Sequence, residues 1–243
     1  MASWNRAPLW VTQVMTVILL LGCRAETALA HREDFVDETL VYETLERGEF
    51  EPEYWFDEAH RSDPSRNFVR HNLAAEVGIT EHWMIDTRAT MQKEEGQALR
   101  FDSARLETRY RFFDESTLPM DIAVSGEVNV ERDEQGADSF GIEPRLILSK
   151  DFQKLNLTLN LSEEVPFDSH TNIFNVSSGF RYDSTELFRF GSELKYDFAD
   201  HEGALIPQLW FAFPHEITLK MGYSHGFDRS QENFFRVAFE KGF

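Results

Sequence analysis

Charged side chains that recur at every second position are the part of this sequence best placed to do chemistry. Arg105, Glu107, Arg109 and Arg111 follow one another at this spacing, which places side chains on one face of a β-strand. A row of guanidinium groups in a pore is the chemistry of an anion-selecting ladder. The same row, with Glu107, Glu127 and Glu143 on its own and flanking strands, makes a network of ion pairs. The pattern leaves both readings open, and we favour the ion-pair network.

The elements that must position these residues are strands. From residue 48 onward, apolar and polar residues alternate with a period of two, as Leu155 and Leu157 do against Asn156 and Thr158. Connections after the even-numbered segments read as turns, and those after the odd-numbered segments are longer and polar. The expected strands span residues 49–57, 66–79, 83–92, 100–112, 119–131, 140–150, 154–162, 171–182, 186–198, 204–213, 216–225 and 233–243.

The last of these segments carries a resemblance to a known class of protein. Phe235, Val237, Phe239 and Phe243 lie on one face, and only Lys241 interrupts the apolar series. The pattern resembles the terminal strand of bacterial outer-membrane β-barrels, where such an alternation, ending in Phe, is the signal read by the β-barrel assembly machinery. The resemblance implies an all-β, closed antiparallel up-and-down transmembrane barrel of about 12 strands. It also implies outer-membrane lipid, lipopolysaccharide and the assembly machinery as partners.

A soluble sandwich or barrel also alternates, but it turns its apolar face inward. The export signal described below and the terminal Phe favour a barrel with its apolar face toward lipid and its polar face toward the lumen. Aromatic residues near strand ends, such as Tyr54, Trp55 and Phe56, predict girdles at the membrane interfaces. The residues predicted to line the lumen are Arg88, Arg105, Glu107, Arg109, Arg111, Glu127, Glu143, Arg145, Arg181, Arg189, Glu193, Lys195, Trp210, Lys220, Arg236 and Glu240.

The first 30 residues read as a cleaved signal peptide. Arg6 provides a positive start, residues 11–22 are mostly apolar, and Ala28 to Ala30 have the small-x-small pattern of a cleavage site. A lipoprotein signal with lipidation of Cys23, the only cysteine, is the alternative. This segment predicts export, and together with the resemblance of the terminal strand it predicts a place in the outer membrane of a Gram-negative bacterium.

Residues 31–47 are predicted to form a short amphipathic helix, because Phe35, Val36, Thr39, Leu40 and Glu43 recur at spacings of three and four. We expect it to be a solvated periplasmic lead-in to the barrel of residues 48–243. A plug in the lumen or a helix at the rim are the alternatives.

Composition excludes one class of partner and matches the barrel. The formal net charge of -19, with no basic patch, argues against nucleic acid. The chain combines 22 Phe with 28% charged residues, and a barrel that faces lipid outside and water inside needs both.

The function that these patterns favour is a small channel or transporter for small polar solutes. The first alternative is a structural or binding barrel whose lumen is closed by salt bridges. The second is an outer-membrane hydrolase, for which His71 lies on the predicted lipid face without an assignable serine. The other histidines lack metal-ligand spacing. We therefore predict no catalytic residue, no metal and no cofactor.

Overall fold

The computed structural model describes residues 33–60, 67–133, 136–169, 171–228 and 233–243, so the predictions for the signal peptide and Cys23 lie outside them. Within these ranges the chain forms twelve strands and no helix, and none of this part has a helix able to cross a membrane. The strands are β1 (Phe50–His60), β2 (Phe68–Thr80), β3 (Trp83–Glu94), β4 (Arg100–Arg111), β5 (Asp121–Arg132), β6 (Asp138–Phe152), β7 (Leu155–Pro166), β8 (Ile173–Asp183), β9 (Phe188–Asp197), β10 (Glu202–Phe213), β11 (Ile217–Gly226) and β12 (Asn233–Lys241).

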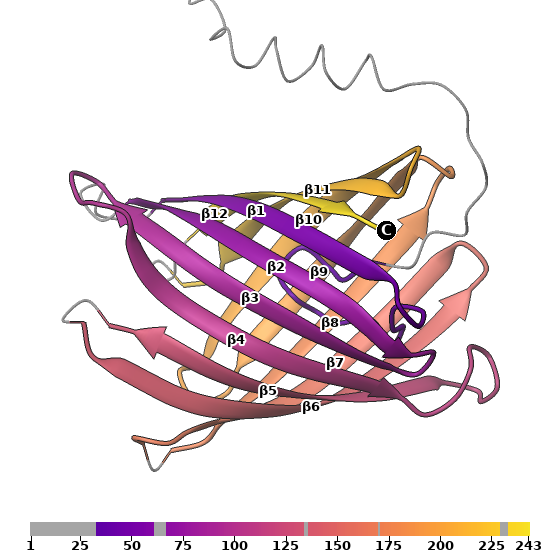
Figure 1. Ribbon diagram of the computed structural model, residues 1–243, viewed down its shortest axis with the longest axis horizontal. Coiled ribbons are helices and arrows are strands. Elements are labelled where there is room, and N and C mark those ends of the chain that lie inside the picture. Colours follow the sequence, from indigo (N-terminus) through magenta and orange to yellow (C-terminus); the bar gives the residue numbers. More distant parts are fainter. Residues whose placement is uncertain (1–32, 61–66, 134–135, 170, 229–232) are drawn as a thin grey trace, which may run out of the picture.

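The strands form one closed antiparallel sheet in sequence order (Figure 1). β1 pairs with β12 from Glu53–Glu240 to His60–Asn233, and this seam closes the barrel. Closure leaves no strand edge to be satisfied by solvent or another chain. The predicted fold class is confirmed.

The period-two alternation separates the two faces of the wall. On β5, Ser125 and Glu127 are buried toward the lumen, whereas Val124 and Val128 are exposed on the outside. Apolar side chains exposed in this way are what a strand presents to lipid. Trp55 departs from the expected girdle, because it lies on the inner face beneath Arg88, whose guanidinium carbon is 3.5 Å from the ring centroid.

The two ends of the barrel differ. One end, which we call the turn end, carries the short connections 81–82, 153–154, 184–187 and 214–216 together with the start of β1 and the end of β12. The connection at 112–120 on this end is longer than predicted for a turn. The opposite end, which we call the loop end, carries the connections that follow the odd-numbered strands.

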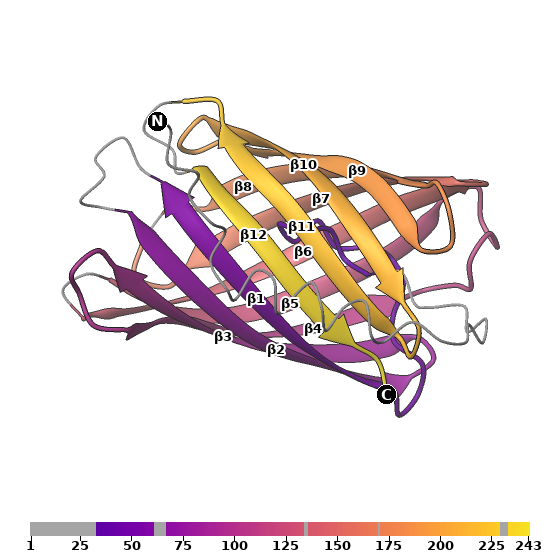
Figure 2. The same ribbon diagram turned by 90° about the horizontal axis from the view of Figure 1, so that it is seen from above.

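The prediction of a solvated helix at residues 31–47 is wrong for residues 33–47, which we call the lumen segment. They form no helix and lie inside the barrel, as the indigo trace in Figures 1 and 2 shows. The segment bends where the Phe35 N–H donates to the Thr39 carbonyl at 3.2 Å and Glu38 adopts a φ of 72°. Some of its backbone N–H groups donate to side chains of the wall instead of to a helical turn. Val36 N donates to Gln208 Oε1 and Leu40 N to Asn160 Oδ1, both at 2.7 Å.

Candidate functional site in the barrel lumen

The lumen segment begins on two arginines at the turn end. Glu33 accepts from Arg189 Nη1 at 2.5 Å and from Thr218 Oγ1 at 2.8 Å, and it pairs with Arg181 at 3.4 Å. Burial would raise the pKa of the Glu33 carboxyl, but the charges of Arg189 and Arg181 outweigh it and lower the pKa to about 2. Glu33 therefore binds the wall as a carboxylate.

The next carboxylate makes a two-pronged contact with β4. Asp34 accepts from both terminal nitrogens of Arg109, at 3.0 and 2.6 Å. The same guanidinium donates to the backbone carbonyls of Val41 and Glu43 and lies 3.4 Å from Glu107. Arg109 is 1% exposed. It therefore joins both arms of the lumen segment to the wall.

The bend of the lumen segment carries two more carboxylates into the middle of the barrel. Asp37 pairs with Lys195 at 3.1 Å and with Arg236 at 3.6 Å. Glu38 accepts from both Arg88 and Arg105. Burial opposes the charge on Glu38, but these guanidinium groups hold its pKa well below the usual value. The left-handed backbone at Glu38, which costs about 1–2 kcal/mol for a residue with a Cβ, is offset by these ion pairs.

Apolar side chains fill the space between the arms and the wall. Phe35 meets Trp210 edge to face, with ring centroids 5.7 Å apart, and both are fully buried. Leu40 and Tyr42 pack against Ala123 and Ile147. Trp210 thus fills the lumen against the segment instead of narrowing an empty pore.

A row of acidic side chains crosses five of the twelve strands, from β2 to β6. The pairs Glu76–Asp86, Asp86–Glu107, Glu107–Glu127 and Glu127–Glu143 stand directly opposite one another on neighbouring strands. Like charges in direct opposition are destabilising, and arginines on the diagonals compensate. Arg105 lies 3.5 Å from Glu127, and Arg145 lies 2.8 Å from Glu143 and 3.8 Å from Glu107.

Arg111 stands apart from this network. It lies at the rim of the turn end, where Nε donates to the Glu81 carbonyl at 2.8 Å and the guanidinium pairs with exposed Asp114 at 3.9 Å.

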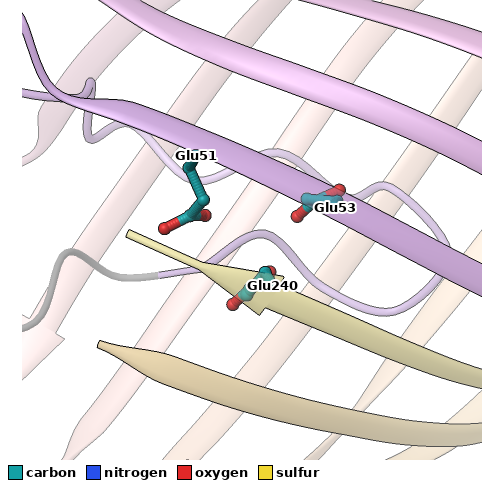
Figure 3. A group of neighbouring side chains, drawn as sticks. All are labelled: Glu51, Glu53 and Glu240. Carbon is teal, nitrogen blue, oxygen red and sulfur yellow. The ribbon is translucent and has the colours of Figure 1, made fainter. Parts of the chain in front are cut away.

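Three carboxylates converge on the inner face near the seam (Figure 3). Glu51, Glu53 and Glu240 each offer an oxygen within 4.8 Å of the others, a geometry that could hold a metal ion. Lys220 lies 3.3 Å from Glu53 and 2.6 Å from Glu240. Its ammonium group therefore supplies a positive charge to this cluster.

The lumen is hollow on the side of the bend that faces the loop end. A cavity of about 610 Å³ has Arg70, Gln92 and Arg100 in its lining, and a second of about 370 Å³ has Glu164 and Asn175. Asp37 and Glu38 line both. We call this space the vestibule, and the bend of the lumen segment lies at its inner end.

The predicted lumen residues point inward, and Arg181, Arg189, Glu193, Lys195, Lys220, Arg236 and Glu240 lie around the lumen segment or the seam. The sequence did not predict that the acidic side chains within residues 33–38 and on the inner face of β1 belong to the lumen. The signal for β1 is the alternation of Glu51, Glu53, Trp55 and Asp57 with Pro52, Tyr54 and Phe56.

The residues of the terminal pattern lie on the outer side of the seam. Phe239 is 46% exposed and Phe243 is 69% exposed, and Phe235 and Val237 are half-buried on the same face. The backbone of Phe243 exchanges hydrogen bonds with that of Phe50 at 3.0 and 3.2 Å. His71 also lies on the outer face, where its Nδ1 is 2.7 Å from the hydroxyl of Tyr54.

Acid is expected to loosen the lumen segment. The pKa of Glu33 is about 2 in the barrel, against 4.5 for an unperturbed glutamate, so its contribution to docking is complete above pH 4.5. It falls as the pH drops from 4.5 to 2, by up to about 3 kcal/mol. Hydrogen exchange of residues 33–47, corrected for intrinsic rates, should show full protection at pH 6 and less at pH 3. Glu33→Gln should flatten this dependence. Equal protection at both pH values would contradict the expectation.

The geometry defines a closed transmembrane-type barrel with a charged lumen and a segment bound inside it. No known family model matches the sequence, and none of the curated proteins matches it either. Among solved structures, the chain resembles the KdgM porin (TM-score 0.62, 10% identity, 79% of this chain and 99% of that chain). It also resembles the NanC porin (0.58, 14%, 78% and 98%) and an outer-membrane channel from Pseudomonas putida F1 (0.60, 9%, 83% and 98%).

At these identities the comparisons show the fold, which is that of outer-membrane porins. Almost the whole length of each neighbour is matched, while about a fifth of this chain is not. The neighbours are described as porins and channels.

Proposed function

We propose that this protein is an outer-membrane channel for small polar solutes. The vestibule carries the proposal, because its larger cavity, of about 610 Å³, has room for many water molecules and is lined by arginine, glutamate, asparagine and glutamine side chains. Such a lining replaces part of the hydration shell of a polar solute and offers little to an apolar one. The porin fold of the wall supports the same assignment. One of the neighbours, the KdgM porin, is described in complex with oligogalacturonate.

A barrel with a permanently closed lumen is the second candidate. The observation that favours it is the lumen segment, whose Phe35, Val41 and Leu45 are completely buried within the barrel. In this reading the ion pairs of the wall are structural and the vestibule is a binding site open to one side only. The two candidates differ in whether anything passes the segment.

Location and partners complete the proposal. A closed wall with apolar side chains outside is matched to the hydrocarbon of a bilayer, and the porin neighbours support the outer membrane as its place. Because outer-membrane barrels have their short turns on the periplasmic side, the turn end faces the periplasm. Outer-membrane lipid, lipopolysaccharide and the assembly machinery are its proposed partners. A mature chain found in the soluble fraction of cells, without detergent, would contradict this location.

Conductance in planar bilayers tests the channel. We expect the purified full chain to give discrete conductance steps, and liposomes that contain it to swell in small polar solutes. The variant Asp34→Asn/Glu38→Gln, which weakens the attachment of the lumen segment, should give more frequent steps. No conductance and no swelling with either protein would contradict the channel and leave the closed barrel as the better candidate.

A further inference from the structure

We propose that the lumen segment, residues 33–47, is a displaceable gate that opens the channel by withdrawing toward the turn end. The inference rests on the proposed channel function and adds its regulation. It is carried by three features of the described residues: the shape of the wall, the second partners of the arginines, and the path of the chain.

The wall is shaped to receive the segment. Gly179 on β8 faces inward, and a Cβ at this position would lie 2.5 Å from the ring of Phe35. Gly222 on β11 also faces inward, and a Cβ there would lie 2.8 Å from Cγ1 of Val36. A real Cβ does not approach so closely without displacement of its neighbour. Two glycines on different strands thus make room for two successive side chains of the segment, which makes this a specific docking site.

The wall is also prepared for the departure of the segment. Removing one partner of a buried ion pair is costly when the other charge is left uncompensated. Each of the six arginines that bind the segment has a wall carboxylate within reach. Arg236 is 2.6 Å from Asp57, Arg109 is 3.4 Å from Glu107, and Arg105 is 3.5 Å from Glu127.

Arg88 likewise has Asp86 at 3.6 Å, and Arg181 and Arg189 have Asp183 at 3.4 and 3.7 Å. No arginine of this set therefore loses all of its negative partners when the segment leaves. The carboxylates of Glu33, Asp34, Asp37 and Glu38 move from the lumen into water, where they are solvated. These six arginines are thus electrostatically compensated in both states of the lumen, which favours a two-state element.

The path of the chain allows withdrawal without unfolding the barrel. The segment starts at the turn end beside Arg189 and reaches its bend at Glu38. It then returns to the turn end, where Gly48 N donates to the Gly78 carbonyl at 2.8 Å before β1 begins. Because both arms leave by the same mouth, the loop can move out with every strand pair intact. The vestibule on the far side of the bend would then become continuous with the turn end.

A reversible lock tests the gate. The Cβ that Gly222 would carry lies 3.3 Å from Cβ of Val36, close to the 3.5–4.5 Å separation found across disulfides. The only cysteine of the chain is Cys23, in the predicted signal peptide, so Val36→Cys/Gly222→Cys offers a single pair in the mature protein. We expect the oxidised protein to lose all conductance steps and the same membrane to regain them after addition of dithiothreitol. The conductance of the single variant Val36→Cys should be unchanged by oxidation and by dithiothreitol.

A second variant acts in the opposite direction and needs no thiol. Gly179→Val/Gly222→Val should expel the segment and give persistent conductance, although it adds bulk to the lumen. Gly126→Val is the control for a valine in place of a strand glycine, because Gly126 lies on the outer face of β5, away from the lumen segment, with nothing within 4 Å of its Cβ position.

The outcomes separate the gate from the channel. Equal and steady conductance of the full chain, the oxidised lock and the double valine variant would overturn the gate and leave the channel standing. Absence of conductance from all of them, including the reduced lock, would overturn the channel and the gate with it.

Discussion

Replacement of Arg109 by methionine is expected to lower the free energy of unfolding by about 3–5 kcal/mol, the typical cost of breaking a buried ion pair. The guanidinium is 1% exposed and binds Asp34 through two nitrogens. Its loss would strand the carboxylate of Asp34 in the lumen, whereas Glu107 would keep Arg145 at 3.8 Å. Urea titration, followed by the heat-modifiable gel mobility of the barrel and by tryptophan fluorescence, measures the change.

An exposed ion pair provides the control for this prediction. Arg132 pairs with Asp138 at 2.7 Å, but its side chain is 40% exposed, and exposed pairs contribute little. Arg132→Met should therefore leave the unfolding transition almost unchanged. Asp34→Asn should restore part of the stability lost in Arg109→Met, because it removes the stranded charge. The interpretation of Arg109 is wrong if its variant and Arg132→Met unfold alike.

Phe243→Ser is expected to reduce the amount of assembled barrel in cells on the order of ten-fold or more. If the assembly machinery binds the ring as an aromatic anchor, loss of the ring removes about 1.5–3 kcal/mol of binding. The same substitution should hardly change the stability of the barrel refolded in detergent. In the folded barrel the ring is 69% exposed, with its centroid 6.5 Å from that of the Phe50 ring, and the hydrogen bonds to Phe50 that close the seam come from the backbone.

Quantitative detection of the folded form in outer-membrane fractions, beside urea titration of the refolded protein, separates these effects. Phe227→Ser is the matched control, because Phe227 is similarly exposed, at 61%, and lies in a connection outside the terminal strand. If Phe243→Ser assembles normally, the terminal ring is not part of the proposed assembly signal. A loss of assembly matched by an equal loss of stability would assign it a structural role instead.

The strands could be predicted from the sequence because the pattern that defines them is local. Alternation alone placed the strand at 216–225, which the structure has at Ile217–Gly226, and the strand at 83–92, which it has at Trp83–Glu94. A wall between lipid and a polar lumen imposes that alternation on every residue of a strand. The alternation predicted the number of strands, whereas the closed transmembrane barrel was predicted from the export signal and the resemblance of the terminal strand.

The conformation of the lumen segment could not be predicted, because it depends on partners far away in the sequence, although a plug in the lumen was one of the alternatives. The spacing of Phe35, Val36, Thr39 and Leu40 is also that of an amphipathic helix, and no local signal distinguishes the two. The side chains of Gln208 and Asn160 take the N–H groups of Val36 and Leu40 that a helix would have used. The same applies to the ion pairs. Parity places an arginine on the inner face, but it does not identify the carboxylate with which that arginine pairs.

The docked segment also has a consequence for how the strands slide past one another. A slip of one residue between neighbouring strands would turn the apolar side chains into the lumen, so the inside–outside alternation excludes it. A slip of two residues keeps every apolar side chain toward lipid. The lumen segment touches β4 through Arg109, β8 through Arg181 and β12 through Arg236. A strand that slipped by two residues would carry its arginine about 7 Å along the wall, out of reach of the segment. The fifteen residues of the lumen segment can thus help to select the correct register between strands, and with it the shear of the barrel.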